Sequence, residues 1–279
     1  MFAYAFANGI NAVEVDAMDA HVATALGQVV RSGRAPSDLN VFCRIVPRIP
    51  LPLPSPHFQA DQVYPGRHIG AQINKLLGQL GIERIALAHL PAWSPEWLDE
   101  GDWLTTFSQL RRSGKIADFG VATFAHDADA ALGAVASGRI GSVQVMLNLF
   151  DPHPLHALLP LCARQDVAFI ARAPFYHGGL IARSAEMRGA ARWGDWRDAH
   201  FYPDHRRETR ERAEQVAHEI GSDDFAATAL RFCLSSSVST VAVGMQSPAH
   251  LLANLAASRS EKMDPRQVAT LATRHRWLV

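Results

Sequence analysis

The chain has 279 residues, of which 48% are hydrophobic, enough to bury the core of one barrel-sized domain or of two smaller ones. Its 27 lysine and arginine residues balance 27 aspartate and glutamate residues, so it lacks the basic field that recruits nucleic acid or an anionic membrane. The three cysteines are widely spaced, which predicts buried thiols of a reducing compartment, and no apolar run approaches the roughly 20 residues of a transmembrane helix. We therefore expect a cytoplasmic protein that binds neither nucleic acid nor membrane.

Strand-like runs alternate with helical patterns along the chain. The expected strands are residues 10–17, 39–46, 84–90, 117–123, 142–149, 167–174 and 240–245. The expected helices are residues 2–8, 20–32, 67–80, 99–113, 126–137, 154–164, 206–220 and 223–235, with a further helix over 249–257. Several strand segments are almost continuous apolar runs, which is typical of parallel strands covered on both faces. This alternation predicts a single α/β domain over residues 1–279, a TIM-type (β/α)8 barrel in its simplest form.

The sequence has one strand segment fewer than such a barrel needs. Residues 2–8 look like the first barrel helix, and no strand segment precedes them. We expect a barrel without its first strand, which would leave strand edges unpaired. Either the chain starts further upstream, or another segment or a second copy in a homo-oligomer covers the open edge.

Six motifs occur at intervals that carry a family resemblance. Residues 114–124, Gly-Lys-Ile-Ala-Asp-Phe-Gly-Val-Ala-Thr-Phe, combine a helix end, a turn and a strand with a polar tip. The other motifs are Gly9-Ile10-Asn11, Leu80-Gly81-Ile82 with Ile85 to His89, Val143 to Leu149, Ile170 to Phe175 with Gly178-Gly179-Leu180, and Val243 to Pro248 with Asn254. In order and spacing these motifs resemble the aldo/keto reductase family from residue 9 to about residue 257.

The resemblance implies the reduction of a small carbonyl or sugar-like substrate by a nicotinamide dinucleotide, NADP or NAD. The family uses a tyrosine as proton donor, a lysine-aspartate pair that lowers the pKa of the tyrosine, and a histidine that orients the carbonyl. The corresponding candidate catalytic residues here are Asp19 for the tyrosine, Arg44 for the lysine, Glu14 for the aspartate and His89 for the histidine. Only His89 keeps the family's residue type.

A register shifted by two residues would instead place Asp16 in the aspartate position and His21 in the tyrosine position. Neither register supplies a tyrosine. A carboxylate is a poor proton donor at neutral pH unless burial raises its pKa, and a guanidinium stays protonated and cannot relay a proton. Tyr64, from the loop after the second strand segment, would have to reach the site from elsewhere.

The resemblance also assigns the cofactor-binding residues. They are Thr123, Gln144, Arg172, Gly244, Ser247 and Asn254. Ser247-Pro248 would begin a helix whose free N–H groups attract a phosphate. Basic residues that grip the 2′-phosphate in NADPH-preferring members are replaced by Met245 and His250. The spacing of histidines and cysteines predicts no metal site.

Three hypotheses about function follow. The first is an NAD(P)H-dependent reductase in which His89 polarises the carbonyl and Asp19 or a water donates the proton. The second is a cofactor-independent enzyme that uses the acidic residues with His89 and Arg44 for dehydration, epimerisation or cyclisation. The third is a catalytically silent binding or scaffold protein.

Overall fold

The computed structural model describes residues 1–51, 58–180, 203–222, 224–245, 247–274 and 276. These residues form two compact units. The first unit comprises Met1–Val145 and Pro154–Ile170, and the second comprises Met146–His153 and Ala171–Val279. Each unit has its own helices and its own buried side chains.

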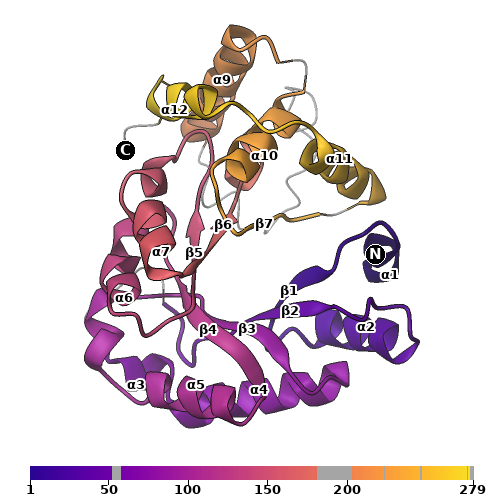
Figure 1. Ribbon diagram of the computed structural model, residues 1–279, viewed down its shortest axis with the longest axis vertical. Helices are drawn as coiled ribbons and strands as arrows, with labels where there is room; N and C mark the ends of the chain where they lie inside the picture. The colour runs from indigo at the N-terminus through magenta and orange to yellow at the C-terminus, as the bar shows by residue number, and fades with distance from the viewer. Residues whose placement is uncertain (52–57, 181–202, 223, 246, 275, 277–279) are drawn as a thin grey trace. The chain divides into compact units, whose positions relative to one another are not determined.

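The first unit is an alternation of strands and helices (Figure 1). Its complete strands are β1 (Ala12–Asp16), β2 (Asn40–Arg44), β3 (Ile85–Leu90) and β4 (Ile116–Ala122). Its α-helices are α1 (Phe2–Ala7), α2 (Ala20–Arg31), α3 (Ala60–Val63), α4 (Gly66–Leu80), α5 (Trp103–Arg112), α6 (Leu132–Ala136) and α7 (Leu158–Gln165). The 3-10 turns η1 (Pro95–Asp99), η2 (Ala128–Ala131) and η3 (His153–Leu155) precede α5, α6 and α7.

The boundaries of these helices follow from local chemistry. The Asp19 carboxylate accepts a hydrogen bond of 3.0 Å from the backbone N–H of Val22 and so caps α2. Helix α4 ends at Gly81, whose φ of 70° is the left-handed conformation that glycine adopts without strain. Gly114 ends α5 in the same way, with a φ of 77°. Both glycines turn the chain back toward the next strand of the sheet.

The sheet follows the chain order. Strands β5 (Ser142–Met146) and β6 (Ala168–Arg172) begin in the first unit and end in the second, and the described strands are ordered β1 to β7. The pairs from β1–β2 through β4–β5 are parallel. Parallel strands in chain order, joined by helices, form a (β/α)8-type barrel, and the described part of the chain has seven of its strands. The predicted barrel fold is confirmed, with α1 and not a strand before β1.

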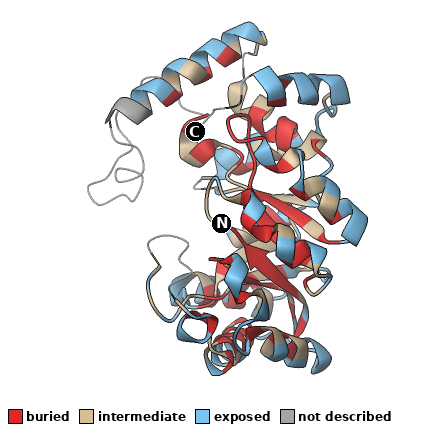
Figure 2. Cartoon of the chain, turned by 90° about the vertical axis from the view of Figure 1, so that its left-hand side faces the viewer, coloured by how far each residue is buried: buried red, intermediate tan, exposed pale blue. Residues whose placement is uncertain are grey.

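The core of the first unit is rich in aromatic side chains. Buried residues follow the strands and one side of each neighbouring helix, while the opposite helix faces are exposed (Figure 2). Six rings form a continuous row with centroids 5.1 to 6.3 Å apart, mostly edge to face. The rings are Tyr64, Trp97, Trp93, Trp103, Phe107 and Phe119, and all are buried. They fix η1, α5 and β4 against one another, and with them the strand that carries Thr123 at its end.

The second unit is mainly helical. Its elements are η4 (Tyr176–Gly178), α9 (Pro203–Glu219), α10 (Phe225–Ser235), β7 (Thr240–Ala242), α11 (Pro248–Arg259) and α12 (Pro265–Arg274). The Asp224 carboxylate accepts a hydrogen bond of 2.9 Å from Ala227 N–H at the start of α10. The thiol of Cys233 in α10 lies 3.2 Å from the Leu147 carbonyl oxygen, which ties the helix to the end of β5.

All seven predicted strands are present, but most are shorter than predicted. The predicted helix over 99–113 begins only at Trp103, because Pro95–Asp99 forms a 3-10 turn that ends before α5. Helices α3 and α12 were not predicted, although α12 buries Val268, Leu271 and Ala272 on one face.

Candidate functional site

The candidate site begins with three residues from three neighbouring strands. In the parallel register, Asp16 of β1 is the partner of Arg44 in β2, and Arg44 is the partner of His89 in β3. Side chains that are paired in register point to the same face of a sheet. Each of the three residues also lies at or next to the carboxyl end of its strand, where barrels carry their functional residues. The fold therefore places an acid, a base and a histidine side by side.

Asp16 and Arg44 form a bidentate ion pair. Arg44 Nε donates to Asp16 Oδ1 at 2.7 Å, and Nη2 donates to Oδ2 at 3.0 Å. The Arg44 side chain is 38% exposed and the Asp16 side chain is 42% exposed, so the pair is accessible to solvent and to a ligand. Burial alone would lower the pKa of Arg44, but its hydrogen bonds to Asp16 and the charges of Asp16 and Glu14 raise it overall. Arg44 therefore acts as a permanent positive charge.

His89 lies beside this pair and is fully buried. Its Nε2 is 2.9 Å from the Ser142 hydroxyl oxygen. Burial, and secondarily the charge of Arg44, lower the pKa of His89 to about 4. The imidazole is therefore neutral at pH 7, and a neutral imidazole has one hydrogen-bond donor and one acceptor. Such a group can orient a carbonyl oxygen but does not supply a proton from its cationic form.

Glu14 and Gln144 form a second polar pair, between β1 and β5. Gln144 Nε2 donates to Glu14 Oε1 at 2.8 Å, and the Gln144 side chain is only 1% exposed. Glu14 therefore does not contact Arg44 through any hydrogen bond seen in the described residues, whereas Asp16 does. The Asp16–Arg44 pair has the arrangement that the shifted register predicts for the family's acid and base.

Asp19 and His21 lie at the start of α2. The Asp19 carboxylate is engaged by the Val22 N–H, and both residues are exposed. Their place at the entrance to the helix follows from the sequence, because Asp is a preferred N-cap residue. The capping contact gives Asp19 a structural role that the sequence prediction did not assign to it.

Tyr64 is enclosed in the aromatic row of the first unit. Its hydroxyl oxygen accepts a hydrogen bond of 3.2 Å from Ala92 N–H, and its ring packs edge to face on Trp97 at 5.9 Å. Burial raises the pKa of Tyr64 well above its usual value. A fully buried phenol with a raised pKa is a weak substitute for the missing tyrosine of the site.

The predicted cofactor-binding residues lie in both units. In the first unit, Thr123 is buried at the end of β4, and its N–H donates to the Gln144 carbonyl at 3.1 Å. In the second unit, Arg172 ends β6 and Gly244 follows β7. Ser247 caps α11 by accepting from His250 N–H at 3.2 Å, as the sequence predicted. Asn254 lies within α11 and is partly exposed.

In the second unit, the free N–H groups at the capped N-terminus of α11 suit a phosphate-bearing group. The Gln144 amide, which the family resemblance assigns to the nicotinamide, already donates to Glu14. Binding of a carboxamide there would compete with that hydrogen bond.

Two residues that support the site were not predicted. Gln72 of α4 is 3% exposed, and its amide binds both backbone groups of Val46, each at 2.9 Å. This contact holds the chain two residues beyond Arg44. Ser142, the partner of His89, was missed as well. No sequence signal marked either residue, since a lone polar residue in a helix or at a strand start is common.

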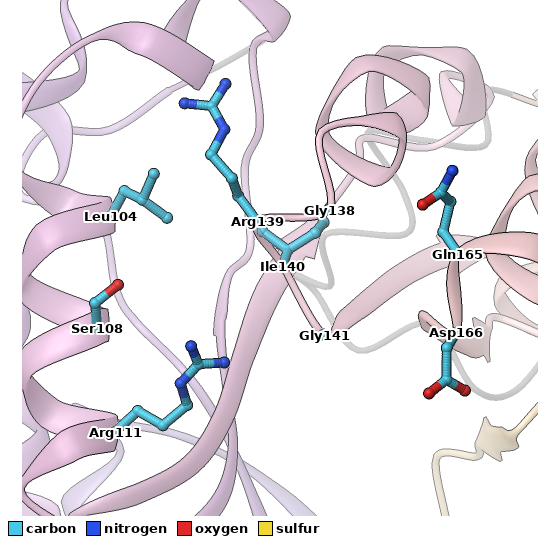
Figure 3. Close-up of a pocket in the computed structure, with 9 residues that line it drawn as sticks. All are labelled: Leu104, Ser108, Arg111, Gly138, Arg139, Ile140, Gly141, Gln165 and Asp166. Carbon is cyan, nitrogen blue, oxygen red and sulfur yellow. The ribbon is translucent and has the colours of Figure 1, made fainter.

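A hollow of about 400 Å3 in the first unit lies among α5 and the turns before β5 and β6 (Figure 3). It is lined by Leu104, Ser108, Arg111, Gly138, Arg139, Ile140, Gly141, Gln165 and Asp166. Both arginines already have acidic partners, Arg111 with Asp118 at 3.3 Å and Arg139 with Asp99 at 2.8 Å. None of the predicted site residues lines this hollow.

The described residues offer neither a metal-ligand cluster nor a membrane-spanning helix. Among them, no group of three or more His, Cys, Asp or Glu side chains is arranged to hold a metal ion. No helix in the described part of the chain is long and apolar enough to cross a membrane.

Solved structures of other proteins share this fold. An aldo-keto reductase from Bacillus halodurans, AKR11C1 in its holo form, superposes with a TM-score of 0.73 at 18% identity, covering 99% of this chain and 89% of that one. The glycerol dehydrogenase AKR11B4 from Gluconobacter oxydans gives 0.71 at 18%, covering 98% and 84%. An aldo/keto reductase from Klebsiella pneumoniae in complex with NADP and acetate gives 0.65 at 16%, covering 99% and 84%. At these identities the likeness shows the fold alone.

The sequence itself shows the family. The sequence model of the aldo/keto reductase family matches residues 56–274, which is most of the chain. A comparison with curated proteins gave no match. The chain belongs to the aldo/keto reductase family, with an aldo/keto-reductase-like oxidoreductase fold.

Proposed function

We propose that this protein is an NAD(P)H-dependent oxidoreductase that reduces the carbonyl group of a small, aldehyde or sugar-like molecule. The observation that carries the proposal is the alignment of Asp16, Arg44 and His89 on three adjacent strands. By resemblance, the family has an aspartate, a lysine and a histidine in this same order, and Asp16, Arg44 and His89 would correspond to them.

The chain's own residues divide the work as follows. His89, which is neutral at pH 7 because its pKa is about 4, would donate a hydrogen bond to the carbonyl oxygen. The Asp16–Arg44 pair is half exposed and would hold the water that gives up the proton, since neither Asp19 nor His21 is a tyrosine. The positive charge of Arg44 would stabilise the negative charge that develops on that oxygen.

The cofactor, NADPH or NADH, supplies the hydride when bound. By family resemblance, Thr123 and Gln144 would hold the nicotinamide amide and Arg172 would lie against the nicotinamide ring. Gly244, Ser247 and Asn254 would hold the adenosine-phosphate end. The free N–H groups at the start of α11 support the phosphate assignment. Met245 and His250 replace the usual basic residues, so we propose no preference between the two cofactors.

A second function has one observation in its favour. The Gln144 amide is already bound to Glu14, and Glu14, Asp16, Arg44 and His89 together offer acidic and basic groups without any cofactor. Such a set suits dehydration, epimerisation or cyclisation of a hydroxy-carbonyl compound. A protein that binds a ligand without turnover is the third candidate, and the absence of tyrosine from positions 19 and 21 supports it.

We propose that residues 1–279 act as one domain in the cytoplasm on a small-molecule substrate. We also propose that the protein forms a homo-oligomer that covers the open edge of the barrel, because an unpaired strand edge tends to associate with another chain.

The deciding experiment is a titration of the purified protein with NADPH and NADH, followed by calorimetry and by quenching of tryptophan fluorescence. We expect saturable binding of at least one cofactor and transfer of deuterium from its C4-deuterated form to an aldehyde or aldose. A failure to bind at millimolar cofactor would contradict the reductase. Incorporation of solvent deuterium into a hydroxy-carbonyl substrate would then favour the second function.

Matched variants sharpen this test. Asp16→Asn removes the negative charge that pairs with Arg44. Asp118→Asn removes the negative charge that pairs with Arg111 in the same unit. Loss of hydride transfer in the first variant but not in the second assigns the activity to the aligned residues.

A further inference from the structure

The hollow shown in Figure 3 lies at the amino ends of strands of the first unit. The turn Gly138–Gly141 leads into β5, and Asp166 lies just before β6. The aligned Asp16, Arg44 and His89 lie at or next to the opposite, carboxyl ends of β1, β2 and β3. The hollow is therefore separate from the candidate site, and its volume of about 400 Å3 is that of a small-molecule pocket.

One face of α5 forms a wall of the hollow. Leu104, Ser108 and Arg111 follow one another at helical spacing, so they lie on the same side of the helix. Figure 3 shows these three side chains pointing toward the turn that carries Ile140. Leu104 and Ile140 supply apolar surface, Ser108 supplies a hydroxyl and Arg111 supplies a positive charge. Together they can contact both the carbon chain and the charged group of one molecule.

Two neighbouring groups hold the guanidinium of Arg111 at this wall. Its Cζ atom lies 5.4 Å from the centre of the buried Phe119 ring, which is a cation–π contact. Its Nη1 lies 3.3 Å from Asp118 Oδ1, and that oxygen also accepts a hydrogen bond of 2.8 Å from Phe119 N–H. A Cβ atom at Gly141 would overlap the Asp118 carboxylate. Arg111 is thus oriented before any ligand binds, which lowers the entropic cost of binding.

Most of the hydrogen-bonding capacity of Arg111 is available to a ligand. A guanidinium has five N–H donors. In the part of the chain that the structure describes, the contact from Nη1 to Asp118 is the one hydrogen bond of Arg111, and it is longer than usual for charged groups. The Arg111 side chain is 49% exposed, so an oxyanion can reach the remaining donors.

Basic residues outnumber acidic ones around the hollow. Residues 111–118, 138–141 and 164–166 form or adjoin its lining, and Asp99 pairs with Arg139. The charged residues of this set are Arg111, Arg112, Lys115, Arg139 and Arg164 against Asp99, Asp118 and Asp166. The local charge is positive in a chain whose net charge is zero. Asp166 lies on the side away from α5 (Figure 3), which favours a molecule with one anionic group over a polyanion.

We propose that this hollow is a second binding site of the protein, for a small organic anion. The carboxylate or phosphate group of the anion binds Arg111, and its carbon chain packs on Leu104 and Ile140. Ser108 and Gln165 are further polar residues of the lining. None of the residues assigned to the carbonyl substrate or to the cofactor takes part. The inference therefore goes beyond the proposed function and does not depend on it.

The test locates a bound anion through isoleucine methyl groups. In protein with 13C-labelled isoleucine methyl groups, the Ile140 signal reports on the hollow, and the Ile45 signal reports on the strand end beside Arg44. Ile140→Val and Ile45→Val identify the two signals. The probes are succinate, inorganic phosphate and the uncharged succinamide, each titrated into the millimolar range.

We expect the Ile140 signal to shift with succinate or with phosphate but not with succinamide. Tighter binding of succinate would identify a carboxylic acid as the class of ligand, and tighter binding of phosphate would identify a phosphate ester. A shift of Ile45 alone, no shift of Ile140 with either anion, or an equal shift with succinamide would overturn the proposal.

Matched variants of α5 assign the binding to Arg111. Arg111→Gln removes the charge, and we expect the affinity for the anion to fall roughly tenfold or more. Arg112→Gln is the control, because Arg112 is exposed on the same helix and does not line the hollow, so it should keep the native affinity. Equal losses in the two variants would mean a general attraction to basic surface and would contradict the site.

A variant that fills the hollow completes the test. Leu104→Trp places a larger side chain in the lining, and we expect it to abolish the shift of the Ile140 signal with either anion. Thermal unfolding of this variant shows whether it is folded. Native affinity in folded Leu104→Trp would overturn the proposal, and the Arg111→Gln result decides it if Leu104→Trp does not fold.

Discussion

Glu14 and Gln144 are 130 residues apart in the chain, yet Gln144 Nε2 donates a hydrogen bond of 2.8 Å to Glu14 Oε1. The bond joins β1 to β5, and its amide side is buried. Glu14 was predicted to be the acid of the site and Gln144 to bind the cofactor. The structure places the two side chains in direct contact, so their hydrogen bond competes with any ligand that either side chain would bind.

Glu14→Ala should destabilise the protein by about 1–3 kcal/mol, because the buried Gln144 amide loses its acceptor. Urea unfolding of Glu14→Ala, Gln144→Ala and the double variant gives the coupling energy between the residues. The exposed pair of Asn11 and Asp38, joined at 2.6 Å, is the matched control and should show a smaller coupling. Equal coupling in both pairs would contradict the importance of burial.

The same variant has a consequence for ligand binding. If Gln144 holds the nicotinamide amide, Glu14→Ala frees its donor, and the calorimetric affinity for NADPH should rise. An affinity that is unchanged would remove Gln144 from the proposed cofactor site.

Asp19→Ala should lower the free energy of unfolding by about 1 kcal/mol, because it removes the cap of α2. Asp19→Asn keeps a capping oxygen, so we expect native stability and native turnover. Thermal unfolding and the hydride-transfer rate of both variants are the measurements. A loss of about 100-fold or more in turnover for Asp19→Asn would instead identify Asp19 as the proton donor.

Asp16→Asn should change stability by less than about 1 kcal/mol, because the ion pair with Arg44 is partly exposed. The hydride-transfer rate should fall far more, by roughly 100-fold, if the pair organises the proton-donating water. Asp99→Asn, which breaks the exposed pair with Arg139, controls for the loss of a surface charge. Parallel losses of stability and rate in Asp16→Asn would mean that the pair is only structural.

Acidification should destabilise the protein through His89. Its pKa in the folded protein is about 4, below the ordinary value of 6.5, so between these two values the unfolded chain binds more protons. Stability from this group is complete above pH 6.5 and falls as the pH decreases toward 4, by about 3 kcal/mol in total. Urea unfolding from pH 7.5 to 4.5 measures this, and His89→Asn should flatten the profile.

Gly120→Ala should destabilise the protein by about 1–3 kcal/mol or more, because the added methyl group overlaps Ser142 within the sheet. Gly70→Ala is the matched control, since a Cβ at this position in α4 meets open space and alanine favours a helix. Thermal unfolding should therefore shift in opposite directions. A tolerated Gly120→Ala would show that β4 and β5 can move apart.

Much of the fold was predictable, for reasons visible in particular residues. The apolar runs of β3 to β6 and the glycines at 81 and 114 gave the alternation of strands and helices, because periodicity and turn chemistry are local. Helix α12 escaped prediction although its buried face is clear in the structure. Most predicted strands were too long, because the position at which a strand ends depends on its neighbouring strand and not on its own residues alone.

The site was predicted less well. His89 and Arg44 were located because they end apolar strands in a recognisable order. The choice between Glu14 and Asp16 stayed open, since both lie on the same face of β1 two residues apart. Ser142 and Gln72 were missed, because a polar residue acquires its role only from the partner that the fold brings to it.

The sequence by itself determined the barrel class, the family and the strand ends on which polar residues gather, because each depends on patterns within a few tens of residues. Only the tertiary structure decided that Asp16 pairs with Arg44, that Glu14 holds Gln144 and that Ser142 meets His89 beside Gly120. These contacts depend on strand register and on burial. A shift of one residue in register turns a side chain to the other face. Burial lowers the pKa of His89 to about 4, so its ring stays neutral at a lower pH than that of an exposed histidine.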